Sequence, residues 1–267
     1  MDWWNKVRVL YVYSRADIAG VGIAGKLIKK VGNELVRGFD EDVVQFEFLE
    51  ELEGFDAFLV LSRHRSETGI PTLTVHSTGN LTKQAMLGGR GEELSMSFPR
   101  LNGFLLRKLR EYGKEAGVLD EVRVSYEATH HGPTGLKRPI SFIEIGSDES
   151  MWRREDLQEL VAETVAEAHS LIIKDELPEC ERAVGFGGGH YSERYTGLTF
   201  ERGVCFGHIV PKYAIREGLS LSVLSQVFEK NFEGVFSAYL EKKAGNKDFR
   251  DLVERFAADR GVKIEYF

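Results

Sequence analysis

Cysteine is scarce in this sequence, because only Cys180 and Cys205 occur among its 267 residues. Two cysteines are too few for a disulfide framework and form no C-x-x-C pair, so we expect both thiols to be reduced. Long apolar runs of about 18 residues are missing as well. The first residues also lack the basic start, apolar stretch and cleavage site of a signal peptide. A cytoplasmic protein without a membrane span is predicted.

Basic residues are also fewer than acidic ones: the sequence has 35 Lys and Arg against 42 Asp and Glu, and its formal net charge is −7. Wrapping a nucleic acid requires many phosphates to be neutralised, so no DNA partner is expected. Local contact with one end of an RNA stays open. Short basic clusters occur at Arg63-His64-Arg65, Lys137-Arg138 and Arg153-Arg154. Each of them, taken alone, is typical of a solvated face.

Several motifs that mark known chemistry are missing. Without a G-x-x-x-x-G-K-[ST] loop an ATPase or kinase is disfavoured, and without a G-x-S-x-G elbow serine chemistry has little support. The H-E-x-x-H zinc motif is absent too. A catalytic zinc ion takes about three protein ligands, and spacing alone neither places nor excludes such a site.

What the sequence does contain is strands and helices intermixed from start to finish. Strands are predicted at 7–14, 43–50, 57–63, 72–78, 121–129, 139–146, 183–191, 204–211 and 262–267. Helices are predicted after the first strand and at 99–117, 153–172, 219–231, 235–243 and 248–260. The polar segment 81–97 is expected to be a mobile loop or a substrate-binding flap. Without a linker or repeat, we predict one α/β domain over 1–267, with a mixed, mostly parallel sheet flanked by helices.

Histidines gather where the predicted strands end. Of the seven histidines, five lie at such ends or in the loops there: His64, His76, His130, His131 and His190. Ligands bind at the carboxyl edge of open α/β sheets, which favours an active site over a buried core. Neighbours on a strand face opposite sides, so His130 and His131 share a pocket only if the strand has ended. Gly132-Pro133 suggests that it has. For His208, in an apolar strand, a core role is the default, and His169 is expected at a helix surface.

A second local signal is "GFGGGHY" (185–191), where four glycines allow a close approach to a ligand. It is no dinucleotide fingerprint, because His190 takes the place of the third glycine and "YSERYT" predicts no helix. A glycine turn packed against a neighbouring strand is the alternative. The adjacent His190 and Tyr191 favour a functional loop.

Together, "THHGPTG" (129–135), "GFGGGHY" with "SERYT" (185–196), and "FGHIVPKYA" (206–214) resemble the signature segments of the archaeal and plant-type D-aminoacyl-tRNA deacylases. The strand with Ser14, Arg15 and Asp17 and the block 58–80 also match, so the resemblance spans nearly the whole chain. "DIAGVGI" (17–23) departs from the family's pattern, with Ile18, Gly20 and Gly22 in place of Pro, Ser and Asn.

This resemblance implies hydrolysis of the ester between a D-amino acid, such as D-tyrosine, and the 3′-terminal ribose of tRNA. The partner would be the tRNA acceptor end, with no membrane involved, and the enzyme would be zinc-dependent and monomeric. Its fold would be similar to that of peptidyl-tRNA hydrolase and nucleoside phosphorylases. Two alternatives stay open: another hydrolase of this fold, such as a peptidyl-tRNA hydrolase, and a non-catalytic module that binds the tRNA end.

Roles for the site follow as hypotheses from this resemblance. Catalysis is assigned to His130, His131 and His190, as general base or zinc ligands, because histidine titrates near neutral pH. The hypothesis for the metal ligands is His131, His190 and His208. Glycine amides of the loop are expected to bind an oxyanion or the terminal phosphate. The predicted substrate-binding residues are Arg63, His64, Arg65, Thr134, Gly187, Gly188, Gly189 and Tyr191.

Overall fold

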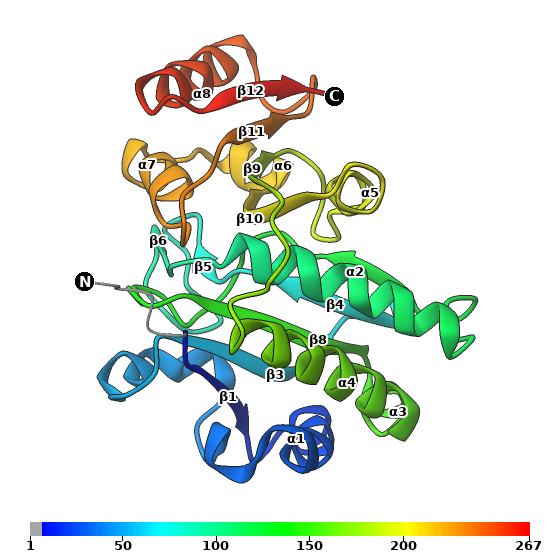
Figure 1. Cartoon of the computed structure of the whole chain (residues 1–267). Coiled ribbons are helices and arrows are strands. Elements are labelled where there is room, and N and C mark those ends of the chain that lie inside the picture. Colours follow the sequence, from blue (N-terminus) through cyan, green and yellow to red (C-terminus); the bar gives the residue numbers. More distant parts are fainter. Residues whose placement is uncertain (1–6) are drawn as a thin grey trace.

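The apolar strands of the first half of the chain form a six-stranded sheet (Figure 1). The computed structural model describes residues 7–267, with the strands in the order β2-β1-β3-β8-β4-β7. Their bounds are β1 (Val9–Ser14), β2 (Val36–Phe39), β3 (Ala57–Arg65), β4 (Thr72–His76), β7 (Arg123–Tyr126) and β8 (Ile140–Ser147). Neighbours are parallel except for β4 and β8, which are antiparallel. This confirms the predicted α/β class with a mixed, mostly parallel sheet.

One face of this sheet is covered by long amphipathic helices (Figure 1). They are α1 (Ile18–Val31), α2 (Pro99–Glu115) and α4 (Glu155–Ile172), with the short α3 (Glu149–Trp152) before α4. Their apolar side chains, such as Leu105 and Val161, form one core with Leu59 and Leu61 of β3. The helices predicted at 99–117 and 153–172 are therefore present. None of the helices in the described chain is long and apolar enough to cross a membrane.

The opposite face is covered by a segment that the sequence analysis predicted as a strand. Residues 43–50 lie in the 3-10 helix η2 (Val43–Glu51), and a second short one is η1 (Asn33–Leu35). Val43, Phe46 and Leu49 are the buried residues of η2. A 3-10 helix has three residues per turn, so every third side chain faces the sheet. The strand prediction was wrong because only every third residue of this segment is buried, although Val44 and Phe48 between them are apolar as well.

A second sheet, which the sequence analysis did not anticipate, is built by the last third of the chain. Its order is β10-β9-β11-β12, and all its neighbours are parallel. The strands are β9 (Glu181–Phe186), β10 (Val204–Val210), β11 (Ser237–Leu240) and β12 (Lys263–Tyr266). The helices are α5 (Glu193–Arg202), α6 (Lys212–Glu217), α7 (Leu221–Glu229) and α8 (Lys247–Asp259). The helix predicted at 235–243 was wrong, because β11 is buried on both faces and shows no alternation. The start of α5 also contradicts the expectation of no helix after the glycine loop.

The two cysteines form a disulfide between Cys180 and Cys205, so the expectation of two reduced thiols was wrong. Parallel pairing of β9 with β10 sets Val204 opposite Glu181. The residues next to them in the chain, Cys180 and Cys205, thereby lie with Cα atoms 6.0 Å apart. That separation is ordinary for a disulfide. The pairing of β9 with β10 thus brings the two cysteines close enough to form a disulfide. Residue spacing in the sequence does not reveal this pairing.

The segment 81–97, predicted as a loop or flap, is partly tied to the rest of the molecule. Glu93 and Leu94 form β6 (Glu93–Leu94), which pairs with β5 (Gly79–Asn80). Lys230 contacts the backbone oxygen of Leu94, which is buried. Met86 and Leu87 are the exposed part, with 88% and 60% of their surface accessible. The segment therefore has an anchored end and an exposed tip.

Candidate active site

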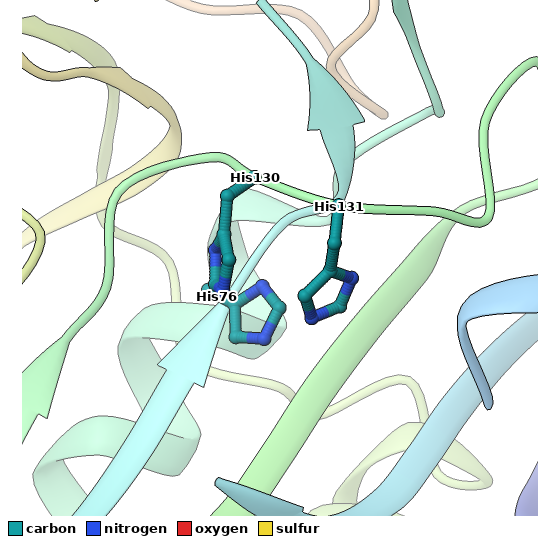
Figure 2. A group of neighbouring side chains, drawn as sticks. All are labelled: His76, His130 and His131. Atoms are coloured by element: carbon teal, nitrogen blue, oxygen red, sulfur yellow. The ribbon is translucent and has the colours of Figure 1, made fainter. Parts of the chain in front are cut away.

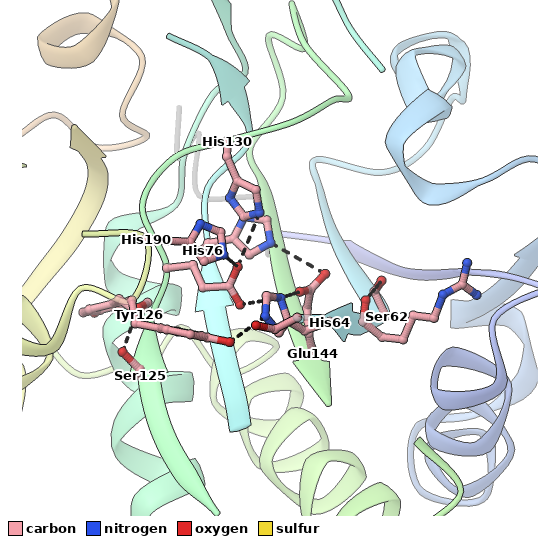
Figure 3. A network of polar contacts seen from close by, with 12 residues as sticks. Ser62, His64, His76, Ser125, Tyr126, His130, Glu144 and His190 are labelled. Carbon is pink, nitrogen blue, oxygen red and sulfur yellow. Dashed lines mark hydrogen bonds and ion pairs between the residues drawn. The ribbon is translucent and has the colours of Figure 1, made fainter. Parts of the chain in front are cut away.

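Strand register places three polar side chains on one face of the six-stranded sheet (Figure 3). His76 of β4 faces Phe142 of β8 in register, and Glu144 lies two residues further along β8 on the same face. His64 pairs in register with Gly146, again on this face. It is the face opposite α1, α2 and α4, where the core is formed by side chains such as Phe142. The sheet thus gathers two histidines and a carboxylate on one face of its inner strands β3, β8 and β4.

Glu127, just beyond the end of β7, is the centre of the cluster, and only 1% of it is exposed. Its Oε1 lies 3.0 Å from Nδ1 of His64. Its Oε2 lies 3.1 Å from Nε2 of His190 and 3.3 Å from Nε2 of His130. Neither oxygen receives a well-directed hydrogen bond from residues 7–267. A buried carboxylate with three imidazoles around it and spare acceptor capacity is typical of a functional site rather than of a core.

Glu144 is the second carboxylate of the cluster, and 3% of it is exposed. Its Oε2 lies 3.5 Å from Nδ1 of His64, and its Oε1 lies 3.6 Å from Nε2 of His76. His64 is therefore shared between Glu144 and Glu127. Its other ring nitrogen, Nε2, lies 2.8 Å from the hydroxyl of Tyr191. Figure 3 shows this chain of contacts running through the site.

His130 and His131 point into the same cluster, although they are neighbours in the chain. β7 ends at Tyr126, so the alternation of a strand no longer applies to them. His131 has a left-handed backbone with φ of 43°, which turns its side chain toward His130, and the ring centroids are 4.3 Å apart. Figure 2 shows both rings close to His76. The prediction that the strand has ended at the turn is confirmed.

Burial and charge pairing divide the site into charged and neutral groups. Burial alone raises the pKa of a carboxylate, but contacts with His64 and His76 lower that of Glu144 to about 2. The pKa of Glu127 is likewise held well below its usual value by His190 and His64 despite burial. Burial lowers the pKa of His64, yet the two carboxylates raise it to about 11. Desolvation lowers the pKa of His131 to about 4, so this imidazole is neutral at pH 7.

The structure brings together many of the predicted residues and adds three, of which His76 was noted at a strand end but given no role. His64, His130, His131, His190 and Tyr191 all lie in or beside the cluster. Glu127 and Glu144 were not predicted. Glu144 had a signal, because it is an acidic residue inside the otherwise apolar strand "PISFIEIG". Glu127 immediately precedes "ATHHGPTG" and becomes recognisable only when the fold surrounds it with histidines.

His208, by contrast, is not brought into the cluster of potential ligands. It is fully buried, and its Nε2–H donates to the backbone oxygens of Lys230 and Ser95 at 3.0 and 3.1 Å. Its Nδ1 lies 3.2 Å from the hydroxyl of Thr129. Both ring nitrogens are therefore used inside the protein. The set of His131, His190 and His208 predicted as metal ligands does not form one group in this structure, and His208 has the core role that was its default.

Alternation along β3 separates the members of the predicted basic cluster. Arg63 faces away from His64: its guanidinium lies 5.6 Å from the ring of Trp152 and 3.7 Å from Asp42. Arg65 is exposed at the end of the strand. The run therefore contributes one side chain, His64, to the buried cluster, whereas Arg65 alternates to the same side as Arg63 and is exposed.

Thr134 is held within the loop structure next to the cluster. Its hydroxyl donates to Glu93 at 2.7 Å and accepts from the backbone N–H of Arg90 at 2.8 Å. Only 2% of Thr134 is exposed. Its hydroxyl therefore fastens the turn after His131 to the segment 81–97.

The glycine loop lies at the carboxyl end of β9, next to His190. Gly187 and Gly188 have φ of 133° and 75°, which other residues rarely adopt. A side chain at Gly187 would also come within 2.8 Å of Glu241. The amides of Gly188 and Gly189 donate to no backbone oxygen among the described residues. These free donors stand beside the partly exposed His190.

The donor set of His76, His130 and His131 fits a zinc ion. Their ligand atoms lie within 4.8 Å of one another. Each Nδ1 lies next to a backbone oxygen, at 3.3 Å for Ser77, 2.8 Å for Ala128 and 2.5 Å for Gly132. Zinc-binding histidines usually donate one ring N–H to such an oxygen and bind metal with the other nitrogen. His76 Nε2 is buried and without a hydrogen-bond partner in residues 7–267. Three imidazoles with one free position are a known catalytic zinc arrangement.

Buried carboxylates and imidazoles of different protonation state, gathered on one face of an α/β sheet, are groups that acid–base catalysis uses. Fold and site together define an α/β enzyme with a histidine–carboxylate centre.

Comparison with known proteins narrows this class. A family model described as D-aminoacyl-tRNA deacylase matches residues 51–265. Curated D-aminoacyl-tRNA deacylases from Desulfurococcus amylolyticus and Methanocaldococcus jannaschii are 39% and 34% identical to this chain. These matches cover 96% and 97% of this chain and 98% and 99% of the relatives. The chain belongs to the D-aminoacyl-tRNA deacylase family.

A solved structure agrees with the fold. The crystal structure of AF0625, described as a conserved protein of unknown function, superimposes with a TM-score of 0.87 at 27% identity. The match covers 97% of this chain and 95% of that one.

Proposed function

We propose that this protein hydrolyses the ester between a D-amino acid, such as D-tyrosine, and the 3′-terminal ribose of tRNA. Membership of the deacylase family supports this activity, and tRNA is the substrate that the family name gives. The observation that carries the proposal is the buried carboxylate of Glu127, held 3.1 Å from a partly exposed histidine, His190. We extend the proposal to a monomeric enzyme of the cytoplasm, the compartment in which its substrate is charged.

His190 is the general base of the proposed reaction. An aminoacyl ester is already activated, so the enzyme needs to position a water and remove its proton. His190 is partly exposed, with 36% of its side chain accessible, against 20% for His130. Glu127 holds its Nε2 and leaves Nδ1 to take the proton. This pairing of a buried carboxylate with a base is the same logic as in a catalytic triad.

The glycine loop supplies donors for the developing negative charge. Attack of water on the ester carbonyl forms a tetrahedral oxyanion, which backbone N–H groups stabilise when they are fixed in advance. The amides of Gly188 and Gly189 are next to His190 in the chain. We assign these two amides to the binding of the oxyanion. The exposed Arg65 is assigned a contact with the acceptor end of the tRNA.

We propose that His76, His130 and His131 hold the zinc ion that family resemblance implies. When bound, zinc supplies Lewis-acid polarisation of the reacting oxygen or a more acidic water. Metal analysis of the purified protein should give about one zinc per chain for this three-histidine set. His76→Ala should lose the metal, measured by mass spectrometry independently of activity. Equal zinc content in the wild type and His76→Ala would contradict this assignment.

The function is tested by the release of D-tyrosine, L-tyrosine and N-acetyl-tyrosine from charged tRNA. A D-aminoacyl-tRNA deacylase releases D-tyrosine well above the other two. Preferred release of the N-acetylated amino acid would instead identify a peptidyl-tRNA hydrolase. Binding of tRNA without turnover on any of the three would identify a non-catalytic module.

A further inference from the structure

One face of α2 carries basic side chains that form no ion pair with residues 7–267. Arg107, Arg110 and Lys114 follow each other at intervals of three and four residues, which places them on the same side of the helix. None of the three forms an ion pair with a carboxylate of residues 7–267. Their neighbour Lys108, in contrast, is paired with Glu111 and Glu167.

Other cations of the described chain also form no ion pair, but these three lie in a row along one helix. The basic pair predicted from the sequence at 153–154 is neutralised, since Arg153 contacts Glu149 and Arg154 contacts Glu121 and Asp156. The protein as a whole carries a formal charge of −7. The three residues of α2, called here the α2 basic face, line one surface hollow together with Phe200 and Glu111, whose carboxylate is paired with Lys108. They present phosphate-binding groups in a row along a helix.

An apolar pocket of about 270 Å³ opens beside the α2 basic face. It lies between α2, the edge strand β7 and α5. Its lining includes Arg110, Val124, Tyr191, Phe200 and Thr72. The guanidinium carbon of Arg110 lies 4.4 Å from the centroid of the Phe200 ring, and this stacked pair, called here the Arg110–Phe200 platform, lines the pocket. The hydroxyl of Thr72, in a residue that is 1% exposed, has no hydrogen-bond partner among the described residues.

The pocket is connected to the catalytic cluster through a single side chain. Tyr191 lines the pocket, and its hydroxyl lies 2.8 Å from Nε2 of His64. It also forms a β-bridge with Glu127. A group seated in the pocket therefore lies next to the residues assigned to hydrolysis. Tyr191 therefore stands between the pocket and the cluster, and Arg110 of the basic face lines the pocket.

We propose that this pocket binds the terminal base of the tRNA acceptor strand and that the α2 basic face binds the phosphates behind it. The inference rests on the proposed function and names how the same site holds its RNA. Unstacked bases of single-stranded RNA bind on aromatic rings and on guanidinium planes, which the Arg110–Phe200 platform offers. The aminoacyl side chain is the competing occupant. An aminoacyl side chain in the pocket would need no row of cations outside it. The RNA chain attached to a terminal base, in contrast, carries a row of phosphates, which the α2 basic face can bind.

Binding of uncharged tRNA and of the trinucleotide CCA tests the proposal without relying on turnover. In the double variant Arg110→Gln/Lys114→Gln, the Kd for tRNA should rise about tenfold or more at low salt. The slope of log Kd against log salt should fall by about 1 for each charge removed. The matched control Lys247→Gln/Arg255→Gln removes two charges from α8. An equal change in the control, or none in either variant, would overturn the role of the basic face.

The pocket itself is tested with Phe200→Leu, which keeps an apolar side chain and removes the ring. Loss of stacking should weaken CCA binding about tenfold, within the range known for one stacked base. The relative rates for D-tyrosyl- and D-alanyl-tRNA should stay the same. Unchanged CCA binding together with an altered ratio of these rates would assign the pocket to the amino acid and overturn the proposal. CCA binding is measured without hydrolysis. A failure of the deacylase assignment would instead appear in the release assay with charged tRNA, so the two failures can be told apart.

Discussion

The position of His64 depends on a residue without a side chain. Gly146 lies beside it in register, and a Cβ atom there would lie 2.8 Å from Cδ2 of His64 and 2.6 Å from the hydroxyl of Thr72. Contacts that short force one of the partners to move. His64 bridges both carboxylates of the site and Tyr191, so its displacement would be passed on to the whole cluster.

Gly146→Ala should therefore slow deacylation about a hundredfold, the cost of a displacement on the order of 1 Å in a catalytic site. The rate under single-turnover conditions measures it. Gly25→Ala is the matched control, because nothing lies within 4 Å of its new methyl group on α1. That control should keep its rate and gain stability. Equal rates for both variants would show that His64 is not held as described.

His208 is a structural histidine, and its replacement should act on stability alone. His208→Leu keeps the volume but leaves the backbone oxygens of Ser95 and Lys230 without their donor. Unsatisfied buried acceptors cost about 1–3 kcal/mol, measured as the free energy of unfolding in denaturant. The zinc content should not change. Loss of zinc in this variant would show that His208 is a metal ligand after all.

At the scale of elements, the strand order explains both what the sequence predicts and what it hides. Helices at 99–117 and 153–172 are predictable because one apolar stripe at helical spacing faces a single core. The segments 43–50 and 235–243 are not, because a 3-10 helix and a strand buried on both faces carry no such signature. Local patterns also say nothing of which distant strands become neighbours. That pairing creates the second sheet and the disulfide.

The same limit applies to the site. His130, His131 and His190 are predictable, because they follow predicted strands and lie in motifs that resemble those of a known family. Glu127 and Glu144 acquire their meaning only from the histidines that the fold places within 3.6 Å of them. Arg63, although next to His64 in the chain, is carried to the other face by strand alternation.

The disulfide between Cys180 and Cys205 joins β10 to the start of β9, and its removal should weaken the protein. A cross-link that closes a loop of 25 residues contributes about 3 kcal/mol by restricting the unfolded chain. Cys180→Ala/Cys205→Ala should lose about that much free energy of unfolding. Its deacylation rate at low temperature should equal that of the wild type. Two reactive thiols in the native, unreduced protein would contradict the cross-link.

At the scale of the whole molecule, the active site lies where the two sheets meet. The six-stranded sheet provides His64, His76 and Glu144, whereas His190 follows β9 of the four-stranded sheet. One core continues through both, since Leu73 of β4 packs in the same cluster as Phe206 of β10. Neither sheet alone can assemble the catalytic cluster.

This continuous core leads us to expect that the chain unfolds as one unit. Denaturant titrations followed by circular dichroism, tyrosine fluorescence and deacylation rate should then show coincident transitions. Two separated transitions, with the second sheet melting first, would indicate two domains instead of the single one expected from the sequence.

The central claim is that the charged carboxylate of Glu127 directs the hydrolysis of a D-aminoacyl ester, and one comparison tests it most directly. Single-turnover release of D-tyrosine from tRNA is measured for the wild type, for Glu127→Gln and for the exposed control Glu201→Gln. Because Gln keeps the shape and removes the charge, Glu127→Gln should fall by about 10²–10⁴-fold with tRNA affinity unchanged. The control should react like the wild type. A Glu127→Gln variant that releases D-tyrosine at the wild-type rate would contradict the account.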